Sequence, residues 1–138
     1  MFSRFKSLFA KPQSVEFRDA ELGTLTLDSG VWIGAFQHDG RKLRVVVGGT
    51  DSAPDAGLVA CVRALLNRFA DTERKAVEFL RSRESEIRQA HLDFYSFEFL
   101  LEEKLEDFAF EFLADGDDSR VWRVEFVAGR PSQTGFDD

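Results

Sequence analysis

The chain has 138 residues, of which 43% are hydrophobic and 31% are charged, and its 25 acidic residues outnumber its 18 basic residues, giving a formal charge of −7. This length and composition favour one globular domain and exclude a disordered chain. No apolar run approaches the ~18 residues of a membrane-spanning helix, and no secretion signal is evident. The only cysteine, Cys61, excludes an internal disulfide and a thiolate metal cluster. We therefore expect a cytoplasmic protein.

Residues 1–14 are predicted to be a basic amphipathic segment that precedes a single domain, residues 15–138. Phe2, Phe5 and Phe9 recur at helical spacing, and three basic residues lie among them. So short a segment binds anionic lipid only weakly, which favours loose docking on the domain or fraying over membrane contact through the three phenylalanines. A peripheral membrane adaptor is nevertheless one alternative function.

The next part of the chain has the period-two pattern of β-strands. Leu25 and Leu27 alternate with polar residues within 22–28, residues 31–36 alternate in the same way, and 43–47 includes three consecutive valines. Asp28-Ser29-Gly30 and Asp39-Gly40 supply the chemistry of tight turns. The pattern predicts an antiparallel meander of three strands, with a short edge strand at 15–18.

Two consecutive helices are predicted after the meander. Ser52 and Asp55 loosely resemble a capping box for the first helix, and Asp71 or Thr72 is the expected cap of the second. Each helix has one apolar side, which should face the core. The apolar residues are Leu58, Val62, Leu65, Leu66 and Phe69 in the first helix, and Ala76, Val77, Leu80 and Ile87 in the second.

The remaining sequence predicts further strands and a loop. Residues 93–101 fit either a strand or a helix, with the strand favoured, while 108–114 and 121–127 form a β-hairpin and residues from 128 onward a loop. The predicted fold class is α+β. In this single domain, an antiparallel sheet made of an N-terminal meander and a C-terminal β-hairpin packs against the two consecutive helices.

No catalytic or cofactor signature is evident. His38 and His91 lie near no nucleophile motif, and Cys61, beside an apolar stripe, is expected to be a small core residue. Asp115 and its acidic neighbours form a turn without the full spacing of a calcium loop. We expect a protein without enzymatic activity, metal or cofactor, and a small hydrolase or metal-dependent enzyme is the alternative.

The acidic residues are concentrated between Asp93 and Asp118, where Lys104 is the only basic residue. A nucleic-acid partner is not expected, because no basic cluster of sufficient strength is present. The acidic run is either a solvated surface or a docking surface for a basic protein. If it docks a protein, two tryptophans would contribute to binding if they are exposed, Trp32 and Trp122. The acidic residues predicted to bind are Glu98, Glu102, Glu103, Glu106, Asp107, Asp115, Asp117 and Asp118.

The layout resembles that of small bacterial domains of unknown function, some of which are similar to immunity proteins encoded beside toxins. The resemblance covers about residues 15–127 and is carried by Leu22-Gly23, Trp32-Ile33-Gly34 and Trp122 in this order of strands and helices. It implies a protein-binding function, in which an immunity-type inhibitor occludes the basic site of a toxin. The resemblance implies no functional residues.

Overall fold

The computed structural model describes residues 15–100 and 107–138, which form one eight-stranded sheet and two α-helices. The strands follow one another in the sheet in their order along the chain. They are β1 (Glu16–Asp19), β2 (Gly23–Asp28), β3 (Val31–His38), β4 (Arg41–Gly48), β5 (Leu92–Phe99), β6 (Phe108–Ala114), β7 (Asp117–Val127) and β8 (Arg130–Asp137). Every neighbouring pair is antiparallel except β4 and β5, which run parallel.

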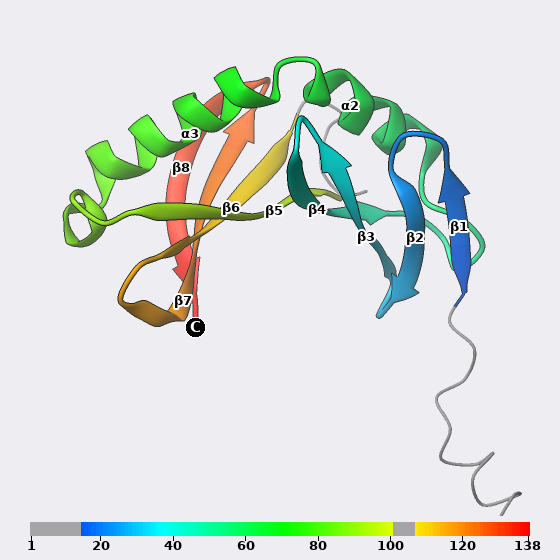
Figure 1. The fold of residues 1–138 in the computed structure, drawn as a ribbon, viewed down its shortest axis with the longest axis horizontal. Helices are drawn as coiled ribbons and strands as arrows, with labels where there is room; N and C mark the ends of the chain where they lie inside the picture. The colour runs from blue at the N-terminus through cyan, green and yellow to red at the C-terminus, as the bar shows by residue number, and fades with distance from the viewer. Residues whose placement is uncertain (1–14, 101–106) are drawn as a thin grey trace, which may run out of the picture.

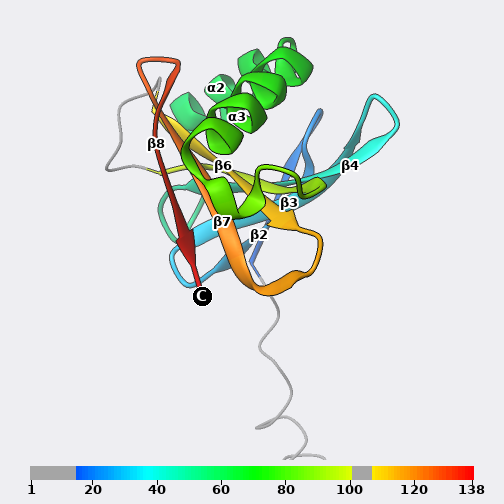
Figure 2. The ribbon, with the colours of Figure 1, turned by 90° about the vertical axis from the view of Figure 1, so that its left-hand side faces the viewer.

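The helices α2 (Ala56–Leu66) and α3 (Phe69–Arg83) form the connection between β4 and β5, together with the short 3₁₀ turn η1 (Ser85–Ile87). A parallel pair of strands needs such a long crossover. Both helices lie on the same side of the sheet, α2 over the half that begins with β1 and α3 over the half that ends with β8 (Figures 1 and 2). Neither helix is long and apolar enough to span a membrane, within the described part of the chain.

The predicted α+β class is wrong. Strand residues far outnumber helical residues, and the meander and the C-terminal strands belong to one mixed sheet that is not closed into a barrel. The two halves join where Val45, Val46 and Val47 pair with Phe97, Glu98 and Phe99. The sequence pattern of a strand does not indicate which other strand it pairs with, so the parallel pairing of β4 with β5 could not be predicted.

The predicted C-terminal loop is also wrong, because residues 130–137 form the edge strand β8. A two-residue turn connects β7 to β8, and both of its residues, Ala128 (φ 52°) and Gly129 (φ 78°), have positive φ. Alanine rarely adopts this conformation, so the sequence did not indicate a tight hairpin. Pro131 also argued against a strand, although proline is tolerated at the edge of a sheet.

Other predicted strands are confirmed, including the ambiguous segment 93–101, most of which lies in β5. The bulge at Tyr95 explains the ambiguity, because one extra residue shifts the register between Phe94 and Ser96. Phe94, Phe97 and Phe99 therefore all face the helices. Neither the regular alternation of a strand nor the spacing of a helix would place these three side chains on one face. The edge strand predicted at 15–18 corresponds to β1.

The first helix is confirmed with a different cap. Asp55, rather than Ser52, is the N-cap of α2, and its Oδ1 accepts a hydrogen bond from the Leu58 N–H at 2.9 Å. The second helix begins earlier than predicted: Phe69 opens α3, and Thr72 is buried, with its hydroxyl donating to the Arg68 carbonyl at 2.9 Å. Phe69 is buried as predicted but belongs to α3.

The core lies between the helices and one face of the sheet and is rich in aromatic rings. Phe110 is fully buried at its centre, with the rings of Phe97 and Phe126 at 5.7 and 5.6 Å. Cys61 is half-buried against this cluster, as expected for a small core residue. All the large aromatic side chains of β6 and β7 point to this side. The opposite face of the sheet therefore carries none of the large aromatic side chains of β6 and β7.

Candidate functional site

The open face is our name for the side of the sheet opposite α2 and α3. No described helix or strand covers it (Figure 2). Because successive side chains of a strand point to opposite faces of the sheet, the open face carries the residues that alternate with those of the aromatic core. One cross-strand row runs over all eight strands, and its members are Glu16, Thr26, Ile33, Val46, Glu98, Ala109, Glu125 and Gln133.

A charge cluster lies on this face, where β5, β6 and β7 are neighbours. The Arg123 guanidinium approaches three carboxylates: Nη2 lies 2.8 Å from Glu98 Oε1, Nη1 lies 3.4 Å from Glu111 Oε2, and Nε lies 3.5 Å from Glu125 Oε1. The Ser96 hydroxyl donates to Glu111 at 2.6 Å, and the Gln133 amide donates to Glu125 at 2.7 Å. One cation thus organises acidic side chains from three strands.

The charge cluster is largely shielded from water even though no described element lies over it. The side chains of Arg123, Glu98 and Glu111 are only 19%, 18% and 12% exposed. Desolvation lowers the pKa of Arg123, but the hydrogen bond that it donates to Glu98 and the charges of all three glutamates raise this pKa above its ordinary value overall. The guanidinium therefore stays charged, and the three carboxylates leave an excess of negative charge.

We call the part of the open face on β5 to β8 the acidic half. By register it also includes two exposed acids near the strand ends, Asp93 on β5 and Asp137 on β8, and its cations among the described residues are Arg123 and Arg130, which lies opposite Val127 at the start of β8. Three of its apolar side chains are exposed, Val127 at 49%, Tyr95 at 39% and Leu113 at 37%. The acidic half therefore combines net negative charge with accessible apolar surface.

The rest of the open face, on β1 to β4, has a groove of about 480 Å³. Arg44 reaches from this groove toward the acidic half, with its Cζ 5.1 Å from the centre of the Tyr95 ring. The groove is therefore continuous with the acidic half. Its lining residues are Thr24, Thr26, Asp28, Ile33, Gly34, Ala35 and Arg44.

The acidic residues predicted for binding do not form one surface. Glu98 alone lies within the charge cluster. Asp107 accepts a hydrogen bond from the Ala128 N–H at 3.0 Å, beside the β7–β8 turn, and Asp115 is exposed in the β6–β7 turn. Glu102, Glu103 and Glu106 lie outside the described residues, as does the side chain of Asp118.

Asp117 and the two tryptophans have structural roles. The carboxylate of Asp117 accepts hydrogen bonds from Ser119, Arg120 and the Trp122 indole. Burial raises the pKa of Asp117, but these three donors lower it below its usual value overall. Trp122 and Trp32 are fully buried, and the Trp32 indole donates to the Thr50 carbonyl at 2.8 Å. The tryptophans are therefore core residues rather than parts of an exposed binding surface.

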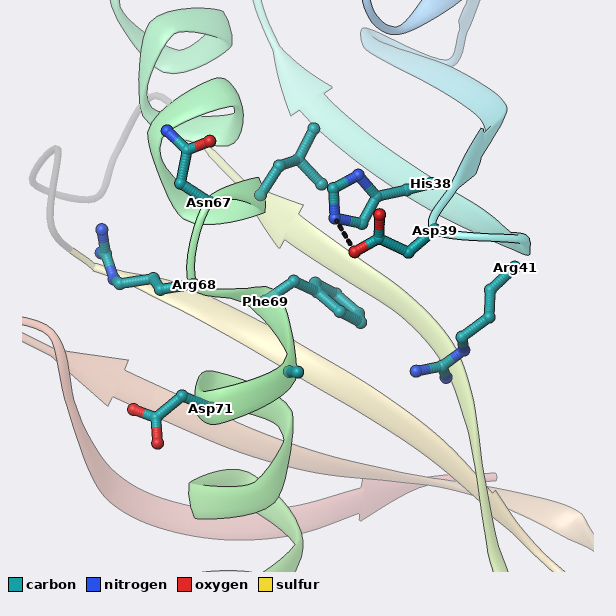
Figure 3. Close-up of a pocket in the computed structure, with 9 residues that line it drawn as sticks. His38, Asp39, Arg41, Asn67, Arg68, Phe69 and Asp71 are labelled. Carbon is teal, nitrogen blue, oxygen red and sulfur yellow. Dashed lines mark ion pairs between the residues drawn. The ribbon is translucent and has the colours of Figure 1, made fainter.

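A separate cavity of about 450 Å³ lies between the β3–β4 turn and the corner where α2 meets α3 (Figure 3). Phe69 points into it, with the His38 ring 6.1 Å away. Two guanidinium–carboxylate bonds, at 2.8 and 2.9 Å, hold Arg41 to Glu73 and raise the pKa of Arg41. The Arg41 guanidinium, which lines the cavity, is therefore already paired.

The polar groups of this cavity do not converge on a point where a reaction could occur. His38 Nε2 lies 3.5 Å from the exposed carboxylate of Asp39, while Arg68 and Asp71 point away from this pair (Figure 3). The lining contains no Ser, Thr or Cys that the histidine could activate. Among the described residues, no group of three or more His, Cys, Asp or Glu side chains is arranged to hold a metal ion.

Comparison of the chain with protein-family models, with curated proteins and with solved structures gave no match.

Sequence reasoning missed Arg123 and Glu125 as site residues. Both alternate with the buried Trp122, Val124 and Phe126, so their exposure to one face could be inferred from the strand pattern. Matching the buried sides of 108–114 and 121–127 in the predicted hairpin leaves Glu111 on the same face as Arg123, and the structure pairs the two directly. The approach of Glu98 depends in addition on the position of β5, which the sequence did not indicate.

Proposed function

We propose that this chain is a non-enzymatic protein-binding domain whose contact surface is the acidic half of the open face. The observation that carries the proposal is the charge cluster, in which three carboxylates share the single guanidinium of Arg123 on a face that no described element covers. Tyrosine and arginine, here Tyr95 and Arg123, are enriched in protein interfaces. The negative excess fits a basic partner.

An immunity-type inhibitor is the particular form of this function that we propose. Such a protein works by covering the basic site of a toxin, and complementary charge speeds the encounter of the two molecules. The sequence layout supports this form, and the acidic half supplies the surface it needs. A cytoplasmic location is part of the same proposal.

Capture of partners by immobilised protein tests the proposal. Asp93→Lys combined with Glu125→Lys reverses two acids of the acidic half, of which Glu125 is 41% exposed and Asp93 is 64% exposed. The matched control is Glu78→Lys on α3, an exposed acid on the opposite side of the molecule. We expect a partner in lysate of the source organism to bind the wild type and the control but not the double variant.

Two outcomes contradict the proposal. In the first, the partner binds the double variant as tightly as the wild type, and Glu78→Lys abolishes binding. This result would show that the interface lies on the helices. The second is a hydrolytic activity that persists in the purified chain and is lost on substitution of His38 in the cavity. Circular dichroism of each variant establishes that it is folded.

A further inference from the structure

We propose that residues 1–14, the basic segment, bind the acidic half of the open face of their own chain. This inference goes beyond the proposed function, because it requires no partner protein. The basic segment itself lies outside the described residues.

Charge is the first reason for assigning this occupant. The basic segment holds Arg4, Lys6 and Lys11 and no acidic residue, whereas the chain as a whole has an acidic excess. Among the described residues the acidic half holds more carboxylates than cations, since Glu98, Glu111 and Glu125 share Arg123 and the other cation on its strands is Arg130. Bringing Arg4 and Lys6 to this face would neutralise charge that the fold leaves uncompensated.

Apolar complementarity is the second reason. Phe2 and Phe5 are three residues apart, a spacing that places them on one side of a helical turn. The acidic half presents the exposed side chains of Tyr95 and Leu113. Burying phenylalanine rings against these groups removes apolar surface from water, and an aromatic pair with Tyr95 adds to the gain.

The basic segment is also long enough to reach this face. It joins β1 at the edge of the sheet, and β6 is the fifth strand beyond β1. Five strand spacings amount to roughly 24 Å. At about 3.3 Å per extended residue, residues 8–14 can cross this distance, so Phe2, Arg4, Phe5 and Lys6 can lie on the acidic half.

Docking of the basic segment has a consequence for binding that rests on the proposed function. A partner and the segment would compete for one surface, so the segment would lower the apparent affinity of the partner. If the segment covered the acidic half in nine of ten molecules, the apparent Kd would rise about tenfold. Reversing the charges of the segment should then tighten partner binding rather than weaken it.

Paramagnetic broadening in the full-length chain tests the docking directly. A nitroxide is attached to Ser7→Cys in a Cys61→Ala background, and methyl signals are compared between the two sides of the molecule. We expect loss of signal from Ala109 and Leu113 on the open face. The methyl signals of Ala64 on α2 and Ala70 on α3, both exposed on the helical side, should keep their intensity.

Charge reversal makes the test specific. Arg4→Glu, Lys6→Glu and Lys11→Glu together should abolish the broadening, and adding Asp93→Lys and Glu125→Lys to the same chain should restore it. High salt should weaken the broadening in the wild type. Rescue by the second reversal separates direct charge pairing from an indirect effect of either change.

Other results would overturn the inference. Equal broadening on both sides, or none on either, would mean that the basic segment does not select the acidic half. Broadening only in a mixture of spin-labelled and isotope-labelled chains would assign the segment to a second copy. Salt-sensitive binding to anionic lipid vesicles without broadening of the open face would assign it to a membrane. None of these results requires the partner, so they are independent of the capture experiment.

Discussion

Arg123 organises the open face because, within residues 15–100 and 107–138, it is the one cation that Glu98, Glu111 and Glu125 approach. A surface ion pair in water contributes little to stability, but this guanidinium and two of its partners are mostly shielded. Under these conditions, removal of Arg123 leaves the carboxylates without compensation. The cluster is therefore a structural element as well as a proposed binding surface.

Replacement of Arg123 tests this structural role. Arg123→Met should lower the free energy of unfolding by about 2–3 kcal/mol, because the shielded carboxylates of Glu98 and Glu111 lose their cation. Glu125→Gln, at the more exposed edge of the cluster, should cost less than about 1 kcal/mol. Urea unfolding of the two variants measures both values. Similar small losses would show that water, rather than Arg123, solvates the glutamates.

Asp19 gives the fold a defined response to acid. Desolvation raises the pKa of Asp19, but the backbone N–H groups of Leu22 and Glu21 and the Arg63 guanidinium lower it below its usual value of 3.8 overall. The folded state thus favours the ionised form, which contributes stability above about pH 4. This contribution is lost as the pH falls through the pKa of the folded state.

The variant Asp19→Asn isolates that response. It should be less stable than the wild type at neutral pH, and the difference should shrink between about pH 4 and pH 2 as the wild-type carboxylate becomes protonated. Urea unfolding across this range measures the difference, with the exposed Asp115→Asn as the control. A difference that stays constant over the whole range would contradict the assigned hydrogen bonds.

At the scale of elements, the turn between β7 and β8 determines how far the sheet extends. It places Ala128 at φ 52°, a conformation that costs a residue with a Cβ about 1–2 kcal/mol. Asp107 offsets part of this cost, because its carboxylate accepts the Ala128 N–H. The hairpin adds β8 as an edge strand, and the Thr134 hydroxyl of β8 donates a hydrogen bond of 2.6 Å to the carboxylate of Glu84, the residue that follows α3.

Ala128→Gly should therefore stabilise the protein, which is uncommon for a single substitution. Glycine adopts positive φ without steric strain, which favours the folded state, but it also increases the conformational entropy of the unfolded chain, which opposes this gain. We expect a net gain in the free energy of unfolding of about 1 kcal/mol. Ala128→Val is the matched control and should be destabilising, since a β-branched residue fits this region worst. Equal stability of the three proteins would mean that the turn has a different conformation in solution.

The sequence predicted elements with strong local signals and missed those set by pairing. Asp39-Gly40 and the three valines of β4 gave a turn and a strand that the structure confirms. The Ala128 turn was missed because its residues lack a turn signature. The charge cluster was only partly foreseen, since Glu98 reaches Arg123 only when β5 is placed beside β6 and β7.

At the scale of the whole molecule, the two faces of one sheet have separate roles. The helices and the aromatic core cover one face, and this packing accounts for the stability of the fold. The other face carries paired charge, exposed apolar groups and a shallow groove, none of which the core requires. Such a division leaves the open face available for binding, and its acidic half is where we place the partner.

The most direct measurement is the association rate of a captured partner with the wild type and with the Asp93→Lys/Glu125→Lys variant at two salt concentrations. If the acidic half is the contact surface, the reversal should slow association at low salt by about tenfold or more, and the difference should shrink at high salt as the charges are screened. The Glu78→Lys control should associate at the wild-type rate. Equal rates for the double variant and the wild type at both salt concentrations would contradict the account.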